Sequence, residues 1–330
     1  MTIYSIGAIS TDVVTCGRLA PSPTGAQHLG NARTYMLAWL CTRSVGGRIV
    51  LRMEDIDSPR VKPNADAQAV EDLLWLGFDW DEGPDLGGSN GPYVQTQRRD
   101  FYAAAIQRLF ERNLIYPCTC SRTDVAHAAS APHLGQEGAI YPGTCATWNH
   151  ADSMPEPGTY CWRYRLTDEV DEFEDLIRGE QTCNPSLELG DFPVTRKNGD
   201  PAYQLAVAVD DGLMGINQVI RGDDLLPSSF RQRLLQRSLG FPSPQYGHVP
   251  LVVGEDGRRL AKRHGDTRLA TYREAGVPAQ RIIGLLAWSA GLLPEPQPLD
   301  LRSLVSTFDV RCLPREPFVV TPQHEHWLLP

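Results

Sequence analysis

The stretch that decides the fold is GRLAPSPTG at residues 17–25, followed by HLGN at residues 28–31. The apolar segment before it, residues 13–16, is expected to be a short buried strand, and residues 32–42 carry apolar side chains at helical spacing. In an open α/β sheet, ligands bind where a strand turns into a helix, and helix N-termini favour anions. The stretch therefore predicts a nucleotide site, and an ordinary Pro/Gly turn capping a helix is the alternative.

The rest of the chain continues the alternation of strands and helices. Further strands are expected at residues 48–53, 203–209 and 218–221, and further helices at residues 70–76, 101–111 and from residue 281 onward. This order is typical of a parallel α/β sheet. Residues 116–200 interrupt it with a cysteine cluster, several prolines and an acidic run, which indicates an inserted subdomain.

Composition excludes several classes of protein. The chain has 330 residues, a net charge of −9 and 42% hydrophobic residues, which fits a globular protein of about two domains. No apolar run approaches the ~18 residues of a membrane span, and the first residues lack the basic start of a secretory signal. We expect a cytoplasmic protein without a membrane segment. The acidic balance argues against a generally basic nucleic-acid coat, but a local basic face stays open.

Two segments far apart in the sequence carry groups that suit phosphate chemistry. In the first, His28 can donate hydrogen bonds to phosphate oxygens, and Gly30 allows a nucleotide to approach the helix start. The second is RRLAKRHG at residues 258–265, where Lys262 is a compact cation suited to a leaving pyrophosphate. A solvated basic loop is the alternative for the second segment.

Three cysteines, Cys118, Cys120 and Cys145, cluster in the sequence and predict a metal site in a reducing compartment. Zinc takes four ligands, mostly Cys or His, so one position is left over. The candidates for it are His127, His133, Tyr141 and His150. Three buried free cysteines are the alternative.

Several of these motifs resemble one family. The segment APSPTG…HLGN resembles the HIGH-containing segment of class I aminoacyl-tRNA synthetases of the bacterial glutamyl type, with Asn31 in place of the last His. The segment RRLAKRHG resembles their KMSKS loop. The motifs RMEDID, AYQLA and IRGDDL, at residues 52–57, 202–206 and 220–225, resemble other motifs of the family in the same order. The resemblance implies a Rossmann-like parallel sheet.

The resemblance also implies the roles of individual residues. Free glutamate needs cations for two carboxylates and an acceptor for its ammonium group. The residues implied for glutamate are Arg18, Leu19, Ala20, Pro21, Ser22, Glu54, Tyr203 and Arg221. Those implied for ATP and catalysis are His28, Gly30, Asn31 and Lys262. Surface ion pairs, a solvated acidic loop and a core tyrosine are the alternatives for single members of the set.

The cysteine cluster resembles the zinc site of the glutamyl-queuosine tRNA(Asp) synthetases, which are truncated paralogues of the glutamyl enzymes. That resemblance implies one structural zinc held by Cys118, Cys120, Tyr141 and Cys145, with a His or water as the second choice for Tyr141.

The resemblance implies the following division of the chain. Residues 1–16 would be an N-terminal extension, residues 17–115 and 201–268 the catalytic domain, residues 116–200 the zinc-bearing insertion, and residues 269–330 a short helical segment. Only 65 residues follow Gly265, so we expect no anticodon-binding domain.

The implied activity is the activation of L-glutamate by ATP and Mg²⁺ without tRNA, followed by transfer to the queuosine base in the anticodon stem-loop of tRNA(Asp). The alternatives are a short glutamyl-tRNA synthetase that charges a tRNA 3′ end, and a non-catalytic RNA-binding relic. Residues 221–268 carry nine basic and five acidic residues, whereas residues 54–85 carry two basic and ten acidic. The KMSKS-like side is therefore the expected RNA face of a protein that we expect to be a monomer.

Overall fold

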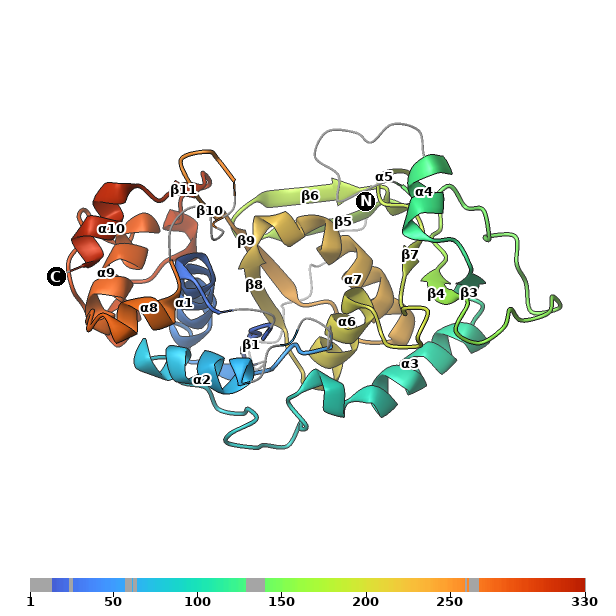
Figure 1. Ribbon diagram of the computed structural model, residues 1–330, viewed down its shortest axis with the longest axis horizontal. Helices are drawn as coiled ribbons and strands as arrows, with labels where there is room; N and C mark the ends of the chain where they lie inside the picture. Colours follow the sequence, from blue (N-terminus) through green and yellow to red (C-terminus); the bar gives the residue numbers. More distant parts are fainter. Residues whose placement is uncertain are drawn as a thin grey trace, which may run out of the picture.

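Figure 1 shows an elongated mixed α/β molecule in the computed structural model, with the described strands β1, β8 and β9 near its centre. The structure describes residues 14–23, 26–56, 61, 64–128, 140–258, 260 and 267–329. The helices α8, α9 and α10 lie at one end of the molecule, and the strands β3, β4 and β7 lie toward the other (Figure 1).

The first parallel pair joins β1 (Cys16–Leu19) to β2 (Arg48–Leu51), with Cys16 opposite Arg48. The helix α1 (Leu29–Arg43) connects the two strands. The strand expected at residues 13–16 is wrong in position, because β1 begins at Cys16 and Val14 is 67% exposed. All four residues of β1 are buried, so the true strand includes a glycine and an arginine that its sequence did not mark as core.

The second parallel pair joins β8 (Gln218–Gly222) to β9 (Gln245–Val249) through the helix α7 (Leu226–Leu239). The strand expected at residues 218–221 is confirmed. Asn217, just before β8, exchanges two hydrogen bonds with Cys16, one from its backbone N–H at 3.0 Å and one to its side-chain oxygen at 2.7 Å. The two pairs therefore meet at the start of β1 and β8.

The strand expected at residues 203–209 is wrong, because Tyr203–Leu213 forms the helix α6. Leu205 to Val209 are all buried. A short apolar run that is buried on every side carries no periodicity, so its pattern does not separate a helix from a core strand. Tyr203 consequently stands at the first turn of a helix rather than at the start of a strand.

The other expected helices are confirmed: they are α2 (Ala65–Trp75), α3 (Arg99–Glu111) and α9 (Ala279–Ser289). Two short helices, α8 (Leu269–Glu274) and α10 (Pro322–Leu328), accompany α9. The C-terminal segment also contributes a strand, β11 (Phe318–Val319), which pairs in parallel with β10 (Val252–Val253).

The segment expected as an insertion is built differently from the centre. Its strands β3 (Ile115–Cys118), β4 (Cys161–Tyr164) and β7 (Phe192–Pro193) form an antiparallel sheet. A separate hairpin consists of β5 (Asp171–Asp175) and β6 (Gly179–Cys183). The helices of this segment are α4 (Arg122–Ala128) and α5 (Pro185–Glu188). The division into domains stays a prediction.

The largest apolar cluster surrounds α1. Ala32, Met36, Leu37 and Leu40 on this helix are each 0% exposed and belong to the same cluster as Ile282 of α9. Because most of α1 is buried in this cluster, the core fixes its N-terminus beside the parallel strands. None of the helices in the described ranges is long and apolar enough to cross a membrane.

Candidate active site

A cavity of about 510 Å³ opens where β1, β8 and the N-terminus of α1 meet. This is the carboxyl end of the strands, where the sequence predicts a ligand site. Nine of the residues implied for glutamate or ATP line it: Arg18, Ala20, Ser22, His28, Gly30, Asn31, Glu54, Tyr203 and Arg221.

Two of the implied residues, Leu19 and Pro21, do not line the cavity, and a third lies outside the described residues. Leu19 is buried behind it with 1% exposure. Pro21 lies beside it through its backbone, since its carbonyl accepts a hydrogen bond from the Glu54 N–H at 3.0 Å. Lys262 lies outside the described residues.

The flanks of the segment that contains Lys262 are hydrogen-bonded beside the cavity. Leu260 donates its backbone N–H to Val252, which lines the cavity. On the other side, Leu29 donates to the carbonyl of Thr267 at 3.1 Å, and Leu269 donates to the carbonyl of Gln27 at 2.9 Å. The described residues on both sides of the segment, Leu260 and Thr267, are therefore hydrogen-bonded to residues that line the cavity or adjoin them.

The start of α1 is closed by its own side chains. His28 is the N-cap, and its Nδ1 accepts from the Gly30 N–H at 3.1 Å. Asn31 accepts from the His28 backbone N–H at 3.3 Å, which completes a capping box. Because Nδ1 is an acceptor, the proton of a neutral His28 is on Nε2. A Cβ on Gly30 would stand 3.0 Å from the His28 ring, so a larger residue would displace the imidazole.

Arg18 lies on the opposite wall and is 7% exposed. Its guanidinium approaches the carbonyl of Ile220 at 3.5 Å and the carboxylate of Asp211 at 3.5 Å. Asp211 is also 2.7 Å from Arg52, which is fully buried and donates to Glu54 at 2.9 Å. Arg18 and Glu54 are thus tied to each other through a buried chain of charges.

Glu54 is 7% exposed at the cavity wall. Burial raises the pKa of its carboxyl group, and the guanidiniums of Arg52 and Arg18 oppose that rise. Burial likewise raises the pKa of the Tyr203 phenol, so Tyr203 is a neutral hydrogen-bonding group at physiological pH.

Arg221, at the end of β8, is 3% exposed and has the densest set of partners in the cavity wall. Its Nη1 donates to Gln232 at 2.7 Å, its Nη2 to Ser229 at 2.6 Å and its Nε to His248 at 3.3 Å. Its guanidinium also lies 5.2 Å from the ring centroid of Tyr246. A guanidinium has five N–H groups, so one on each terminal nitrogen remains for a carboxylate in the cavity.

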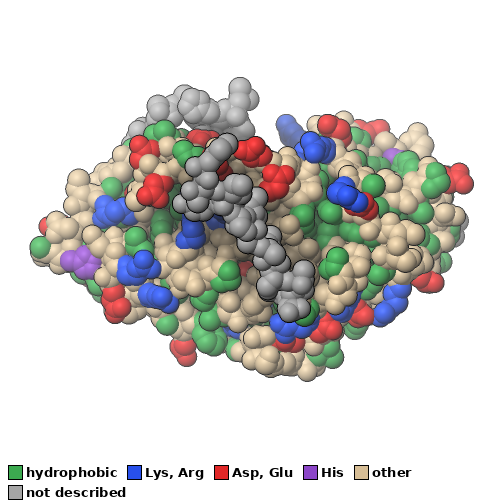
Figure 2. Space-filling model, turned by 180° about the vertical axis from the view of Figure 1, so that it is seen from behind, with side chains coloured by type: hydrophobic (Ala, Val, Ile, Leu, Met, Phe, Trp, Pro, Cys, Tyr) green, Lys and Arg blue, Asp and Glu red, His purple; other side chains and the backbone are tan. Residues whose placement is uncertain are grey.

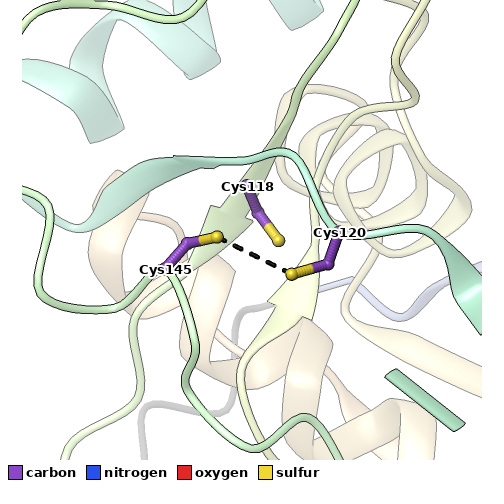
Figure 3. A group of neighbouring side chains, drawn as sticks. All are labelled: Cys118, Cys120 and Cys145. Carbon is purple, nitrogen blue, oxygen red and sulfur yellow. Dashed lines mark hydrogen bonds between the residues drawn. The ribbon is translucent and has the colours of Figure 1, made fainter. Parts of the chain in front are cut away.

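The metal cluster lies apart from this cavity, beside β3 and β4. The sulfurs of Cys118, Cys120 and Cys145 lie within 4.8 Å of one another and point toward a common centre (Figure 3). The Tyr141 hydroxyl is 3.4 Å from the Cys118 sulfur and 3.8 Å from the Cys120 sulfur. Three thiols and one phenol therefore form a four-donor set, with Arg163 stacked 3.8 Å from the Tyr141 ring centroid.

The cluster contains a thiolate-forming group. The pKa of Cys118 is lowered to about 4, first by a hydrogen bond with Cys161 and then by those with Tyr141 and Arg163. Thiolate is the form that binds metal ions. Of the alternatives to Tyr141, His127 and His133 have no described side chain, while His150 stacks 4.4 Å from the ring centroid of Phe110.

Comparison with known proteins matches residues 13–294 to the catalytic domain of class I tRNA synthetases (E and Q). A glutamyl-Q tRNA(Asp) synthetase of Symbiobacterium thermophilum is 50% identical over 306 residues, which are 92% of this chain and 94% of that protein.

The chain belongs to the glutamyl-Q tRNA(Asp) synthetase family.

It is therefore an ATP-dependent ligase of the class I aminoacyl-tRNA synthetase type. The structure is similar to a glutamate-tRNA synthetase from Elizabethkingia anophelis, with a TM-score of 0.81, 27% identity and coverage of 96% of this chain and 70% of that one. A glutamate–tRNA ligase of Nitrosococcus oceani is 39% identical, and the match covers 94% of this chain but 66% of that protein. The chain thus has the length of the glutamyl-Q proteins and not that of the longer ligases.

Several residues of the family's cavity were not identified from the sequence. Thr34 and Tyr35 line it one turn along α1 from Asn31, and Asp224 lines it just beyond Arg221. A search for polar residues one helical turn after the HLGN motif would have found the first two. Asp224 belongs to the motif IRGDDL, and the sequence does not distinguish it from the neighbouring Asp223, which pairs with Arg178.

Proposed function

We propose that the protein activates L-glutamate with ATP in the absence of tRNA and transfers the glutamyl group to the queuosine base of tRNA(Asp). The observation that carries the proposal is the cavity in which Arg18, Glu54 and Arg221 face the N-terminus of α1. Relatives of the same length, named as glutamyl-Q tRNA(Asp) synthetases, support the choice of acceptor.

In this proposal, glutamate lies between the two guanidiniums. Arg221 offers two parallel N–H groups to one carboxylate, and Arg18 offers its guanidinium to the other. The carboxylate of Glu54 accepts from the α-ammonium, with Ser22 and Tyr203 as additional polar contacts. A zwitterion with a second carboxylate matches this arrangement of two cations and one anion.

ATP is assigned to the start of α1. The dipole of the helix favours phosphate at this end, and His28 Nε2–H donates to the oxygens that gain charge in the transition state. Asn31 would act mainly through the capping box that fixes His28. Mg²⁺ entering with ATP would neutralise phosphate charge.

Lys262 is assigned to the pyrophosphate because both flanks of its segment are hydrogen-bonded beside the cavity. The chemistry is an in-line attack of a glutamate carboxylate oxygen on the α-phosphorus, with pyrophosphate as the leaving group. A hydroxyl of queuosine then attacks the mixed anhydride and releases AMP. Correct orientation supplies most of the rate for this reactive intermediate.

The cysteine cluster is proposed as a structural zinc site formed by Cys118, Cys120, Tyr141 and Cys145. Three sulfurs and one oxygen within this spacing suit tetrahedral zinc. With all four positions taken by protein groups, none remains for a substrate.

The acceptor RNA is proposed to bind on the KMSKS-like side. Over the face seen from behind, the acidic and basic side chains of the described residues are interspersed (Figure 2). In this proposal, binding depends on local basic groups of residues 221–268, which carry nine basic and five acidic residues, and the anticodon stem-loop of tRNA(Asp) is the ligand.

Pyrophosphate exchange without tRNA tests the activation step. We expect glutamate-dependent exchange with the protein alone. A strict requirement for tRNA would favour the rival, a short glutamyl-tRNA synthetase that charges a 3′ end. Complete lack of ATP turnover in the folded protein would favour a non-catalytic RNA-binding relic.

A further inference from the structure

Behind the proposed glutamate cavity, a buried aspartate and a buried histidine hold Arg221. The Nδ1 of His248 lies 2.6 Å from a carboxylate oxygen of Asp175, and the Nε2 of His248 lies 3.3 Å from the Nε of Arg221. Ser229 bridges the same groups, at 2.9 Å from His248 Nε2 and 2.6 Å from Arg221 Nη2. None of Asp175, His248 and Ser229 lines the cavity.

The hydrogen bonds assign the proton of His248. The Nε of a guanidinium can only donate, so Nε2 of His248 is the acceptor and its Nδ1 carries the proton that is donated to Asp175. The hydroxyl of Ser229 then donates to Nε2 and accepts from Arg221. Burial lowers the pKa of His248, against the opposing effect of Asp175, which agrees with a neutral imidazole.

Asp175 is itself held in place by hydrogen bonds. One of its oxygens accepts from three backbone N–H groups, those of Ile177, Arg178 and His248, at 3.0, 2.8 and 3.1 Å. The other oxygen is thereby directed at the imidazole. Since Asp175 ends β5, the hairpin of β5 and β6 reaches the cavity wall through His248.

The same series of hydrogen-bonded groups, Asp–His–Ser, activates the nucleophilic serine of many hydrolases, but here it has another role. His248 and Ser229 are 0% exposed and Asp175 is 2% exposed, so no substrate reaches the hydroxyl. The Ser229 oxygen is moreover occupied by Arg221. The three groups therefore act only through the guanidinium.

We propose that His248, oriented by Asp175, is a positioning residue that fixes the plane of Arg221 and thereby determines the affinity of the cavity for glutamate. The inference rests on the proposed function in one respect, namely that Arg221 binds a glutamate carboxylate. Without the acceptor at Nε2, the guanidinium keeps only Gln232 and Ser229 as hydrogen-bond acceptors, both at its terminal nitrogens. Its plane is then held less firmly, and its two inward N–H groups match a carboxylate less well.

Two substitutions of the same residue separate positioning from simple packing. In His248→Gln, the amide oxygen can stand near the former Nε2 and accept from Arg221, while the bond to Asp175 is lost. In His248→Asn, the amide nitrogen can stand near the former Nδ1 and donate to Asp175, while the acceptor for Arg221 is lost.

The experiment measures glutamate-dependent pyrophosphate exchange and the thermal midpoint for both variants and the parent protein. For His248→Asn we expect a KM for glutamate raised by about tenfold, the cost of one hydrogen bond to a charged group, with the KM for ATP unchanged. For His248→Gln we expect a smaller rise. The same KM for both folded variants, or a normal KM in His248→Asn, would overturn the inference.

If neither variant folds, Asp175→Asn takes their place. Its amide oxygen can keep the three backbone N–H groups, while its NH2 group faces Nδ1 of His248, so the imidazole proton moves to Nε2, which can no longer accept from Arg221. We expect a raised KM for glutamate, and a KM equal to that of the parent protein would overturn the inference. Failure of the proposed function looks different, because the parent protein itself would then show no glutamate-dependent exchange.

Discussion

The substitution Asp211→Asn tests the buried charges beneath the proposed glutamate site. Asp211 is 1% exposed and lies 2.7 Å from Arg52 and 3.5 Å from Arg18. It belongs to a buried set of three guanidiniums and three carboxylates, namely Arg18, Arg52, Arg98, Glu54, Asp210 and Asp211. Their charges cancel, so the substitution leaves one positive charge without compensation.

The expected cost follows from that imbalance. Removing one partner of a buried ion pair costs about 3–5 kcal/mol, and asparagine keeps the shape and part of the hydrogen bonding, so we take about 3 kcal/mol. The unfolding entropy is roughly 2.1 cal/mol/K per residue, so for a chain of 330 residues such a loss lowers the thermal midpoint by roughly 4 °C. Because Arg18 loses a partner, the KM for glutamate should rise as well.

The assay is thermal unfolding followed by circular dichroism, with glutamate-dependent pyrophosphate exchange on the same samples. The control is Asp309→Asn, which removes the partner of Arg311 on the surface, where Arg311 is 84% exposed. We expect no measurable shift for the control, since exposed pairs add little. A midpoint of Asp211→Asn within 2 °C of the parent protein would refute the account of a balanced buried network.

Other predictions address the segment after β10, the metal cluster and a buried carboxyl group. Lys262→Ala should slow adenylate formation by about a hundredfold without changing the zinc content, as measured by exchange and metal analysis; normal turnover would contradict its role. Chelation of zinc should loosen residues 116–150 and lower the thermal midpoint, and unchanged stability after complete zinc loss would argue against a structural metal. Burial raises the pKa of Asp72 to about 6, opposed by Arg273. The stabilising contribution of its protonated form is complete below about pH 3.8 and is lost as the pH rises through 6. Relative to the parent protein, Asp72→Asn should therefore gain roughly 1–3 kcal/mol between pH 4 and pH 7, and a constant difference in denaturant unfolding across that range would rule this out.

Local pattern was enough to predict the helices α1, α2, α3 and α9. Each has apolar residues at helical spacing and a clear end, such as Gly46 and Gly47 after α1. The hydrophobic pattern gave a wrong prediction where nearly every residue of an element is buried. The central residues of the helix α6, 205–211, are all buried, and this segment was predicted as a strand; β1 contains Gly17 and Arg18, which do not mark a core strand.

The prediction of the cavity residues from sequence shows the same limit. Motif resemblance predicted nine of the residues that line the cavity, because these stand in short recognisable strings. The groups that hold them in place are distant in the sequence, as with Asp175 and His248, which are 73 positions apart. Nothing local to either residue marks the contact, since it depends on how the hairpin of β5 and β6 packs against β9.

The central claim concerns the group on the tRNA to which the protein transfers glutamate. The protein should be incubated with ATP and labelled glutamate, together with tRNA(Asp) that contains queuosine or lacks it. The account predicts label on the modified base of the queuosine-containing tRNA and none on the unmodified tRNA. Label on the 3′ end of either tRNA would contradict it.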